Sequence, residues 1–228
     1  MSPAVRPIIA CRPEPGLAAT LAAGQKAGLL ITGVPLFEVR PVAWDPPEPS
    51  RFSALLIGSA NAIRHAGSAL ADYRQLPVHA VGRMTASAAL EAGLHVAERG
   101  EGGLQQLLDG TVAAQHFLRL AGEAHVALDS PSGSTITTRI VYDSAALPMP
   151  VVLADLLRGN ALVLLHSGVA AAHFAAECDR LDIDRQSIAL AALAPRIAAA
   201  AGEGWAAVRS AETPHEAALL ALARDMCH

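Results

Sequence analysis

Short, continuous apolar runs alternate with alanine-rich stretches along nearly the whole chain. Residues 8–11, 54–57, 162–165 and 188–193 form such runs, and none of them contains a charged side chain. Strands that are apolar on both faces are typical of parallel sheets that helices cover on both sides. The alternation therefore predicts an α/β fold.

The stretches between these runs supply further elements. Further strands are expected at 29–34, 78–81, 94–97 and 205–208. Helices are expected at 14–27, at 60–70, from Gly82 to Gly93, after 162–165, and from Pro195. A capping box is expected to open the closing helix, with Thr213 as N-cap, Pro214 at the first position and Glu216 three residues after the cap.

Two segments break this alternation and indicate two domains. Residues 35–49 contain five prolines, and residues 130–150 are rich in Ser, Thr and Pro. Each segment also contains a strand-like pattern, at 36–40 and at 138–142. Two extended connections predict that the chain crosses twice between domains. The first domain is then discontinuous and is completed by the C-terminal third of the chain.

A weak internal repeat favours two similar domains. Residues 55–62 resemble residues 163–170 at an offset of 108 positions. Residues 81–86 resemble residues 193–198 at an offset of 112 positions. Two similarities in the same order indicate a duplication.

Composition excludes several classes of function. The formal net charge is −4 and the pI is about 6.1, which argues against nucleic acid or an anionic membrane as the partner. Lys26 is the single lysine, so Schiff-base chemistry has one candidate, and that residue sits at an expected helix end. Three widely spaced cysteines argue against a disulfide framework or a zinc ribbon and fit a reducing, cytoplasmic location. No signal-peptide region or membrane-length apolar run is visible.

The common catalytic motifs are also missing. The sequence has no glycine-rich dinucleotide or phosphate-binding loop, no HExxH or HxxxH pair and no GxSxG elbow. Neither a nucleotide, a metal site nor a hydrolase triad is therefore expected.

Four turns from strand to helix could bind anions, at Ser59, Gly82, Ser167 and Ala194. Ligands of open parallel sheets bind beyond the carboxyl ends of the strands, where helix N-termini present free N–H groups. Arg12, at the turn after the first strand, is a further candidate anion ligand. The alternatives are that Ser59 and Ser167 are ordinary N-caps and that Arg12 is a surface charge over a helix start.

Tyr142 is one of two tyrosines and lies in the second extended connection. A phenol there could donate a hydrogen bond to a leaving oxygen. Packing of the ring within the strand is the alternative.

Taken together, the pattern resembles the uroporphyrinogen-III synthase family over nearly the whole chain. Residues 9–13 resemble its opening turn, although Cys11 replaces the usual Thr. Residues 56–63 resemble its T-S-x-N-A-V segment with Gly58 in place of Thr, and 81–93 resemble its V-G-x-x-T-A segment. Residues 118–122 and 140–142 match its strand ending in Gly and its V-Y linker. The stretch 124–139 is shorter than is typical, which indicates a reduced strand–helix unit in the second domain.

The resemblance implies two flavodoxin-like parallel-sheet domains, joined by a two-stranded β linker, with the active site in the cleft between them. Domain 1 would comprise 1–37 and 147–228, domain 2 would comprise 43–137, and 38–42 and 138–146 would be the linker strands. It also implies a cytoplasmic monomer without metal or organic cofactor, receiving hydroxymethylbilane by a transient hand-over from hydroxymethylbilane synthase.

The implied reaction converts hydroxymethylbilane to uroporphyrinogen III with loss of water and inversion of ring D. Tyr142 would assist the departure of the hydroxyl. The residues expected to bind the substrate carboxylates are Arg12, Ser59, Ala60, Asn61, Gly82, Arg83, Thr85, Ser167 and Gly168.

Two other classes of function remain open from the sequence. One is a non-catalytic two-domain binder of a small polyanionic ligand, which predicts stable binding and no control over the isomer formed. The other is a nucleotide-using α/β enzyme, against which the missing glycine-rich loop argues.

Overall fold

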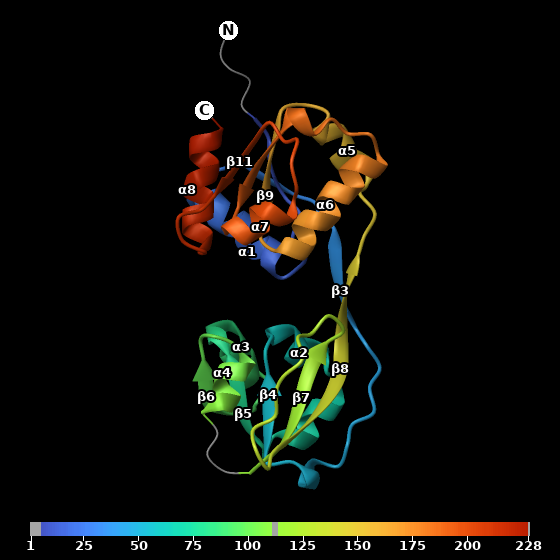
Figure 1. The fold of residues 1–228 in the computed structure, drawn as a ribbon, viewed down its shortest axis with the longest axis vertical. Helices are drawn as coiled ribbons and strands as arrows, with labels where there is room; N and C mark the ends of the chain where they lie inside the picture. Colours follow the sequence, from blue (N-terminus) through green and yellow to red (C-terminus); the bar gives the residue numbers. More distant parts are fainter. Residues whose placement is uncertain (1–5, 111–113, 228) are drawn as a thin grey trace. The chain divides into compact units, whose positions relative to one another are not determined.

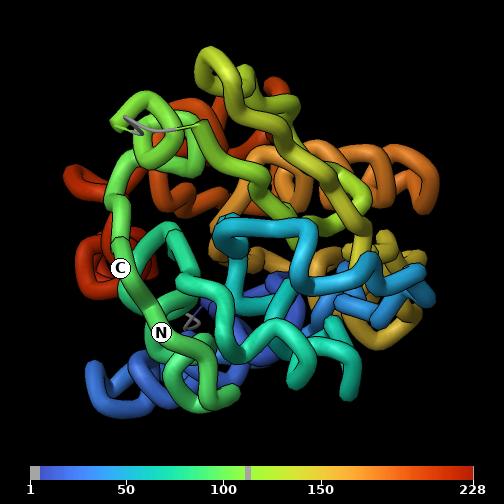
Figure 2. The backbone as a smooth tube through the Cα atoms, turned by 90° about the horizontal axis from the view of Figure 1, so that it is seen from below, coloured from blue at the N-terminus to red at the C-terminus, as the bar shows by residue number. Residues whose placement is uncertain are grey.

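The computed structural model describes residues 6–110 and 114–227. The chain divides into two compact units, unit 1 (Met1–Glu38 and Ala145–His228) and unit 2 (Val39–Ser144). The colours in Figures 1 and 2 follow this division: unit 1 combines the blue start of the chain with its orange and red end, and unit 2 takes the middle. Both boundaries fall inside the two segments, 35–49 and 130–150, that interrupt the alternation. Within the described part of the chain, no helix is long and apolar enough to cross a membrane.

Unit 1 contains a five-stranded parallel sheet in the order β11-β10-β9-β1-β2. The strands are β1 (Ile8–Ala10), β2 (Ile31–Gly33), β9 (Ala161–Leu165), β10 (Ile188–Ala192) and β11 (Ala207–Ser210). Numbered within the unit, the order is 2-1-3-4-5, which is the flavodoxin-like order. The expected flavodoxin-like arrangement is therefore present in unit 1.

Helices cover both faces of this sheet (Figure 1). One face carries α1 (Gly16–Lys26) and α8 (Glu216–Met226), and the other carries α5 (Val151–Leu157), α6 (Gly168–Arg180) and α7 (Pro195–Ala200). Strands β9 and β10 are buried along their whole lengths. The apolar side chains on the two faces of these strands form two hydrophobic cores, one between each face of the sheet and its helices. The same apolar pattern predicted the parallel sheet. A 3-10 helix, η3 (Arg185–Ser187), precedes β10.

Unit 2 contains a six-stranded sheet in the order β3-β8-β7-β4-β5-β6. The strands are β3 (Phe37–Pro41), β4 (Ala54–Ile57), β5 (Pro77–Val81), β6 (His95–Gly100), β7 (His116–Gly122) and β8 (Thr135–Ala146). Helices α2 (Ala60–His65) and α3 (Gly82–Glu91) pack on one face, and α4 (Leu104–Asp109) packs on the other. Two 3-10 helices, η1 (Pro49–Arg51) and η2 (Ser68–Tyr73), lie in the connections.

The expected flavodoxin-like order is wrong for unit 2. From β4 to β8 its strands have the order 3-2-1-4-5, because β7 pairs with β4 on the side away from β5. Hydrophobic periodicity reports which residues are buried and does not specify which strands lie side by side.

The two sheets nevertheless share one spatial arrangement with a different chain order. Strand β4 corresponds to β9, β5 to β10, β6 to β11, β7 to β1 and β8 to β2. The internal repeat of the sequence falls on β4-α2-β5-α3 and on β9-α6-β10-α7. The faces agree as well, because Ala54 and Leu56 lie under α4 just as Leu162 and Leu164 lie under α8. Helix α4 is thus the counterpart of α8.

Helix α1, between β1 and β2, has no counterpart in unit 2. The connection from β7 to β8, residues 123–134, is described throughout and contains no helix. This is the stretch that the sequence indicated as shortened. Its irregular backbone leaves the carboxyl end of β7 without a covering helix.

Two expected helices differ from the structure. The helix expected at 60–70 ends at His65, because Gly67 has a positive φ of 73° and the chain continues as η2. The expected capping box is wrong: α8 begins at Glu216 with His215 as N-cap, and no side chain caps it. The Glu216 carboxylate instead makes tertiary contacts, which are described below.

Candidate functional site

The serines predicted at two strand-to-helix turns are N-caps. Ser59 precedes α2, and its Oγ accepts a hydrogen bond from the Asn61 N–H at 3.2 Å. Ser167 precedes α6, and its Oγ accepts from the Ala170 N–H at 3.2 Å. Gly82 opens α3 with a φ of +76°, a conformation that favours glycine. These turns have the predicted geometry, and each hydroxyl is already used by its own helix.

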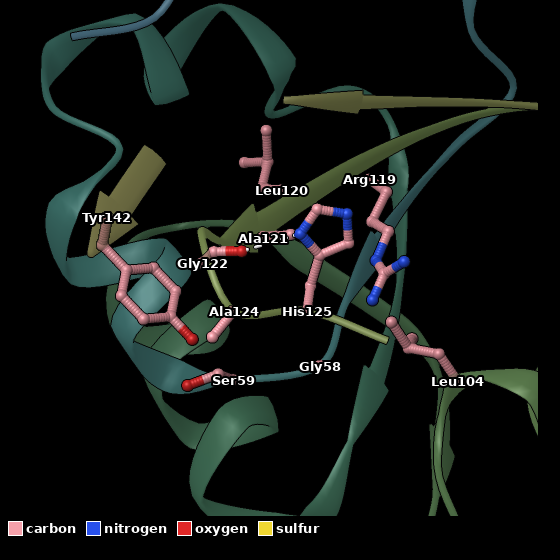
Figure 3. Close-up of a pocket in the computed structure, with 10 residues that line it drawn as sticks. All are labelled: Gly58, Ser59, Leu104, Arg119, Leu120, Ala121, Gly122, Ala124, His125 and Tyr142. Atoms are coloured by element: carbon pink, nitrogen blue, oxygen red, sulfur yellow. Dashed lines mark hydrogen bonds between the residues drawn. The ribbon is translucent and has the colours of Figure 1, made fainter. Parts of the chain in front are cut away.

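A cavity of about 150 Å³ opens at the carboxyl ends of β4 and β7 in unit 2 (Figure 3). At this point of the sheet the chain order reverses, which is where open α/β sheets bind ligands. Its lining comes from the turn after β4, the start of α4, the end of β7, the connection that follows β7, and β8: Gly58, Ser59, Leu104, Arg119, Leu120, Ala121, Gly122, Ala124, His125 and Tyr142.

The cavity brings together two of the predicted site residues, Ser59 and Tyr142. The other unit 2 candidates occupy the first turns of α2 and α3 and are not among its lining residues: Ala60, Asn61, Gly82, Arg83 and Thr85. Arg12, Ser167 and Gly168 belong to unit 1. The predicted site residues therefore fall into three groups: two that line the cavity, five at the starts of helices in unit 2, and three in unit 1.

Tyr142 reaches the cavity because its strand partner is a glycine. Gly122 lies opposite Tyr142 where β7 and β8 pair, and the register shifts at that point. The phenol ring packs directly over the Gly122 backbone, so a Cβ atom there would lie 2.6 Å from Cζ. The ring of His65 lies 6.3 Å from the phenol ring. In Figure 3 the hydroxyl of Tyr142 is turned toward Ser59 and Ala124.

Arg119 is the charged residue among the described residues of the cavity, and it was not predicted from the sequence. It lies within β7 between apolar neighbours and is only 7% exposed. Its Nη1 donates to the Val126 carbonyl at 2.8 Å, whereas its Nε has no hydrogen-bond partner among residues 6–110 and 114–227. Burial lowers the pKa of the Arg119 guanidinium. An arginine inside an otherwise apolar strand was the signal that could have identified it.

His125 was also missed, because it lies in the irregular connection after β7. Its Nδ1 lies 2.9 Å from the Gly122 carbonyl oxygen and 3.1 Å from that of Glu123. Carbonyl oxygens only accept, so Nδ1 carries a proton and donates to both. The Nε2 atom is then the ring nitrogen left for a ligand. No acidic side chain is among the described residues that line the cavity.

Unit 1 places a half-buried carboxylate at the corresponding edge of its sheet. The Glu216 carboxylate accepts a hydrogen bond from Thr20 Oγ1 at 2.7 Å and forms an ion pair with Arg12 Nη1 at 3.3 Å. His166 Nε2 lies 3.3 Å from it. Burial raises the pKa of Glu216, but hydrogen bonds from His166 and Thr20, together with the charges of His166 and Arg12, outweigh burial, and the net pKa is lowered.

Arg12 therefore occupies an internal ion pair. Its guanidinium also lies over the start of α1, where a Cβ atom on Gly16 would come within 2.5–2.7 Å of it. The structure thus places Arg12 over the start of α1, which was the alternative to anion binding. Its carboxylate partner, Glu216, comes from the same chain.

The buried thiols provide no nucleophile. Burial, and to a smaller extent the neighbouring Cys178 thiol, raises the pKa of Cys11 to about 12. Burial likewise raises the pKa of Cys178 to about 12. Thiolate chemistry is therefore not available at these two positions at neutral pH.

A family model described as Uroporphyrinogen-III synthase HemD matches residues 18–221. The chain belongs to the uroporphyrinogen-III synthase family. This is a family of enzymes of porphyrin biosynthesis, and the non-catalytic binder is not favoured. Among curated proteins, none matches the sequence.

Solved structures of uroporphyrinogen-III synthases share the fold. That of the uroporphyrinogen-III synthetase from Helicobacter pylori aligns with a TM-score of 0.68 at 18% sequence identity, covering 97% of this chain and 99% of that chain. That of a mutant uroporphyrinogen III synthase from the extremely thermophilic bacterium Thermus thermophilus aligns with a TM-score of 0.56 at 18% identity, covering 96% of this chain and 98% of that chain. The similarity thus extends over both units of the chain.

Proposed function

We propose that this chain cyclises hydroxymethylbilane to uroporphyrinogen III, with loss of water and inversion of ring D, and is accordingly a lyase. The observation that carries this proposal is the cavity of unit 2, where the phenol of Tyr142 and the guanidinium of Arg119 share a site, with no acidic side chain among the described residues that line it. Such a site accepts negative charge, and the substrate of this reaction carries eight carboxylates.

Tyr142 is proposed to act on the leaving group. The bond from the terminal carbon to its hydroxyl oxygen breaks, the oxygen takes up a proton and departs as water, and the pyrrole N–H gives up a proton, so that a neutral azafulvene is left. A phenol that donates a hydrogen bond to that oxygen stabilises the charge developing there. The azafulvene that remains can close spontaneously without inverting ring D. The protein's part is therefore chiefly to position the two ends of the chain for the inverting route.

The carboxylates are proposed to bind mainly at backbone N–H groups near the helix starts. In unit 2 these are the first turns of α2 and α3, with Ser59, Ala60, Asn61, Gly82, Arg83 and Thr85. In unit 1 the proposed contacts are Ser167 and Gly168, at the start of α6, together with Arg12. Because Arg12 is paired with Glu216, its part in binding requires that this ion pair open.

The remaining proposals concern the chain as a whole. Segments 38–42 and 138–146 are proposed to serve as a two-stranded linker, supported by the position of both unit boundaries within β3 and β8, which are neighbours in one sheet. The enzyme is proposed to act as a cytoplasmic monomer that receives hydroxymethylbilane from its synthase.

The decisive experiment supplies freshly generated hydroxymethylbilane to the pure protein, oxidises the products and separates the porphyrin isomers by chromatography. Predominant isomer III is expected, against isomer I in a reaction without enzyme. Isomer I alone, from protein shown to be folded by circular dichroism, would reject the proposed activity.

A further inference from the structure

The counterpart relation between α8 and α4 indicates what the cavity of unit 2 binds. Glu216 is the first residue of α8, and Leu104 is the first residue of α4. Glu216 extends its carboxylate into the carboxyl edge of the unit 1 sheet. Leu104 lines the cavity at the same edge of the unit 2 sheet. One unit therefore supplies a carboxylate at this place, and the other supplies an apolar side chain.

The groups around the two places are of the same chemical kinds. In unit 1, Arg12, His166 and the Thr20 hydroxyl surround the Glu216 carboxylate. In unit 2, an arginine, a histidine and a hydroxyl also line the cavity, supplied by Arg119, His125 and Tyr142. In unit 1, therefore, a guanidinium, an imidazole and a hydroxyl at this edge of the sheet surround a carboxylate.

The guanidinium of Arg119 lacks the carboxylate partner that Arg12 has in unit 1. The side chain is only 7% exposed, and its Nε has no acceptor within the part of the chain that the structure describes. A buried guanidinium with an unused donor is costly unless a ligand supplies the acceptor. Arginine and carboxylate form the strongest pair of this kind, because two parallel N–H donors match two oxygens.

We propose that the cavity of unit 2 is a carboxylate-binding site in which Arg119 holds one carboxylate of the ligand, in the place that Glu216 fills in unit 1. Leu104 keeps the site open for a ligand from outside. The identification of that carboxylate with a side chain of the substrate rests on the proposed function. The binding of a carboxylate does not.

The test is a titration of the isotopically labelled, full-length protein with propionate, followed by the NMR signals of the arginine Nε–H groups and of the cavity backbone. Saturable millimolar binding with a shift of the Arg119 Nε–H signal is expected. Inorganic phosphate is titrated in parallel. Phosphate binding without propionate binding would overturn the assignment, as would saturable propionate binding that leaves Arg119 unshifted.

Substitutions at Leu104 provide the sharpest comparison. Leu104→Glu supplies the missing carboxylate from the chain itself and is expected to weaken propionate binding at least ~10-fold, whereas the neutral, similarly shaped Leu104→Gln is expected to retain it. Equal weakening by both variants would contradict the proposal.

Substitutions of the arginine provide a second route, should a Leu104 variant fail to fold. Arg119→Gln is expected to abolish saturable binding, and the exposed Arg64→Gln in the same unit is expected to leave it unchanged. Binding that survives Arg119→Gln would overturn the proposal. Propionate binding by a protein that yields isomer I alone would reject the proposed function and leave this site standing. Isomer III from a protein that binds no propionate would do the reverse.

Discussion

The ring of Tyr142 lies directly against the backbone of Gly122, its partner across strands β7 and β8, and a Cβ atom at Gly122 would come within 2.6–2.9 Å of three atoms of the phenol. Atoms at that separation overlap, so any side chain at position 122 displaces the ring. The position of the phenol in the cavity therefore depends on the absence of a side chain at its strand partner.

Gly122→Ala is expected to lower the rate of isomer III formation by roughly 10- to 100-fold, because the phenol hydroxyl moves by about an ångström from its position in the cavity. Steady-state assays of isomer III check this. Gly159→Ala is the matched control, since the nearest atom to a Cβ there is the Leu156 carbonyl oxygen at 3.6 Å, an ordinary contact. A full rate in Gly122→Ala would show that the ring position is not important.

Tyr142→Phe keeps the ring and removes the hydroxyl. The expected result is a fall in kcat of about 10- to 100-fold with little change in KM, because a hydrogen bond to the departing oxygen strengthens in the transition state. The fraction of isomer III among the enzymatic products should stay high, since positioning is retained. An unchanged kcat would remove Tyr142 from the reaction.

Glu216→Gln is expected to destabilise the protein by about 2 kcal/mol, and Arg12→Gln by about 1 kcal/mol. The difference follows from the contacts: Glu216 is the common partner of Thr20, Arg12 and His166, whereas replacing Arg12 removes one partially exposed ion pair and a long hydrogen bond to Thr20. Urea unfolding of the two single variants and the double variant checks this. Strictly additive effects in the double variant would show that the ion pair contributes nothing.

The carboxylate of Glu177 is expected to make the free energy of unfolding depend on pH in the acid range. Two hydrogen bonds from Arg180, opposed by burial and assisted by the Met149 N–H, lower the pKa of Glu177 from 4.5 to about 2. Because the pKa is lower in the folded state, the stabilisation is complete above pH 4.5 and is lost as the pH falls toward 2.

The size of that loss is on the order of 1–2 kcal/mol, since Arg180 is half exposed and water screens the pair. Glu177→Gln should therefore flatten the pH dependence of unfolding between pH 4.5 and 2, measured by urea unfolding at several pH values. The exposed Glu203→Gln serves as its control. Equal slopes in the two variants would contradict the assignment.

The alternation of apolar strands and helices was sufficient to predict the α/β class, since apolar side chains on both faces of a strand require cover on both sides. Lateral strand order was not predictable in the same way. Local periodicity in β4 and β9 is nearly identical, yet β4 is the first of the five strands β4 to β8 along the chain, and β9 is the third strand of unit 1. Which strand pairs with which is decided by tertiary contacts.

The site was predicted in part for a similar reason. Ser59 and Tyr142 were visible because they stand at a turn and in a recognisable segment. Arg119 looked like a strand residue, and its importance arises only when β7 meets the other walls of the cavity. Glu216 was assigned to a capping box from its spacing, and the structure uses its carboxylate for Thr20, Arg12 and His166 instead.

The split composition of unit 1 has a consequence for how the chain is made. Strand β1 pairs with β9, and Ile8 lies opposite Leu162 in that pair. The pair can therefore form only after the ribosome has synthesised the chain as far as β9. At a synthesis rate of ~5–20 residues per second, that interval lasts about 8–30 s. Unit 2 has all its strands within Val39–Ser144, apart from the start of β3 and the end of β8, and can fold during that time. The middle of the polypeptide can thus fold while β1 has met only β2 and still lacks its other neighbour, β9.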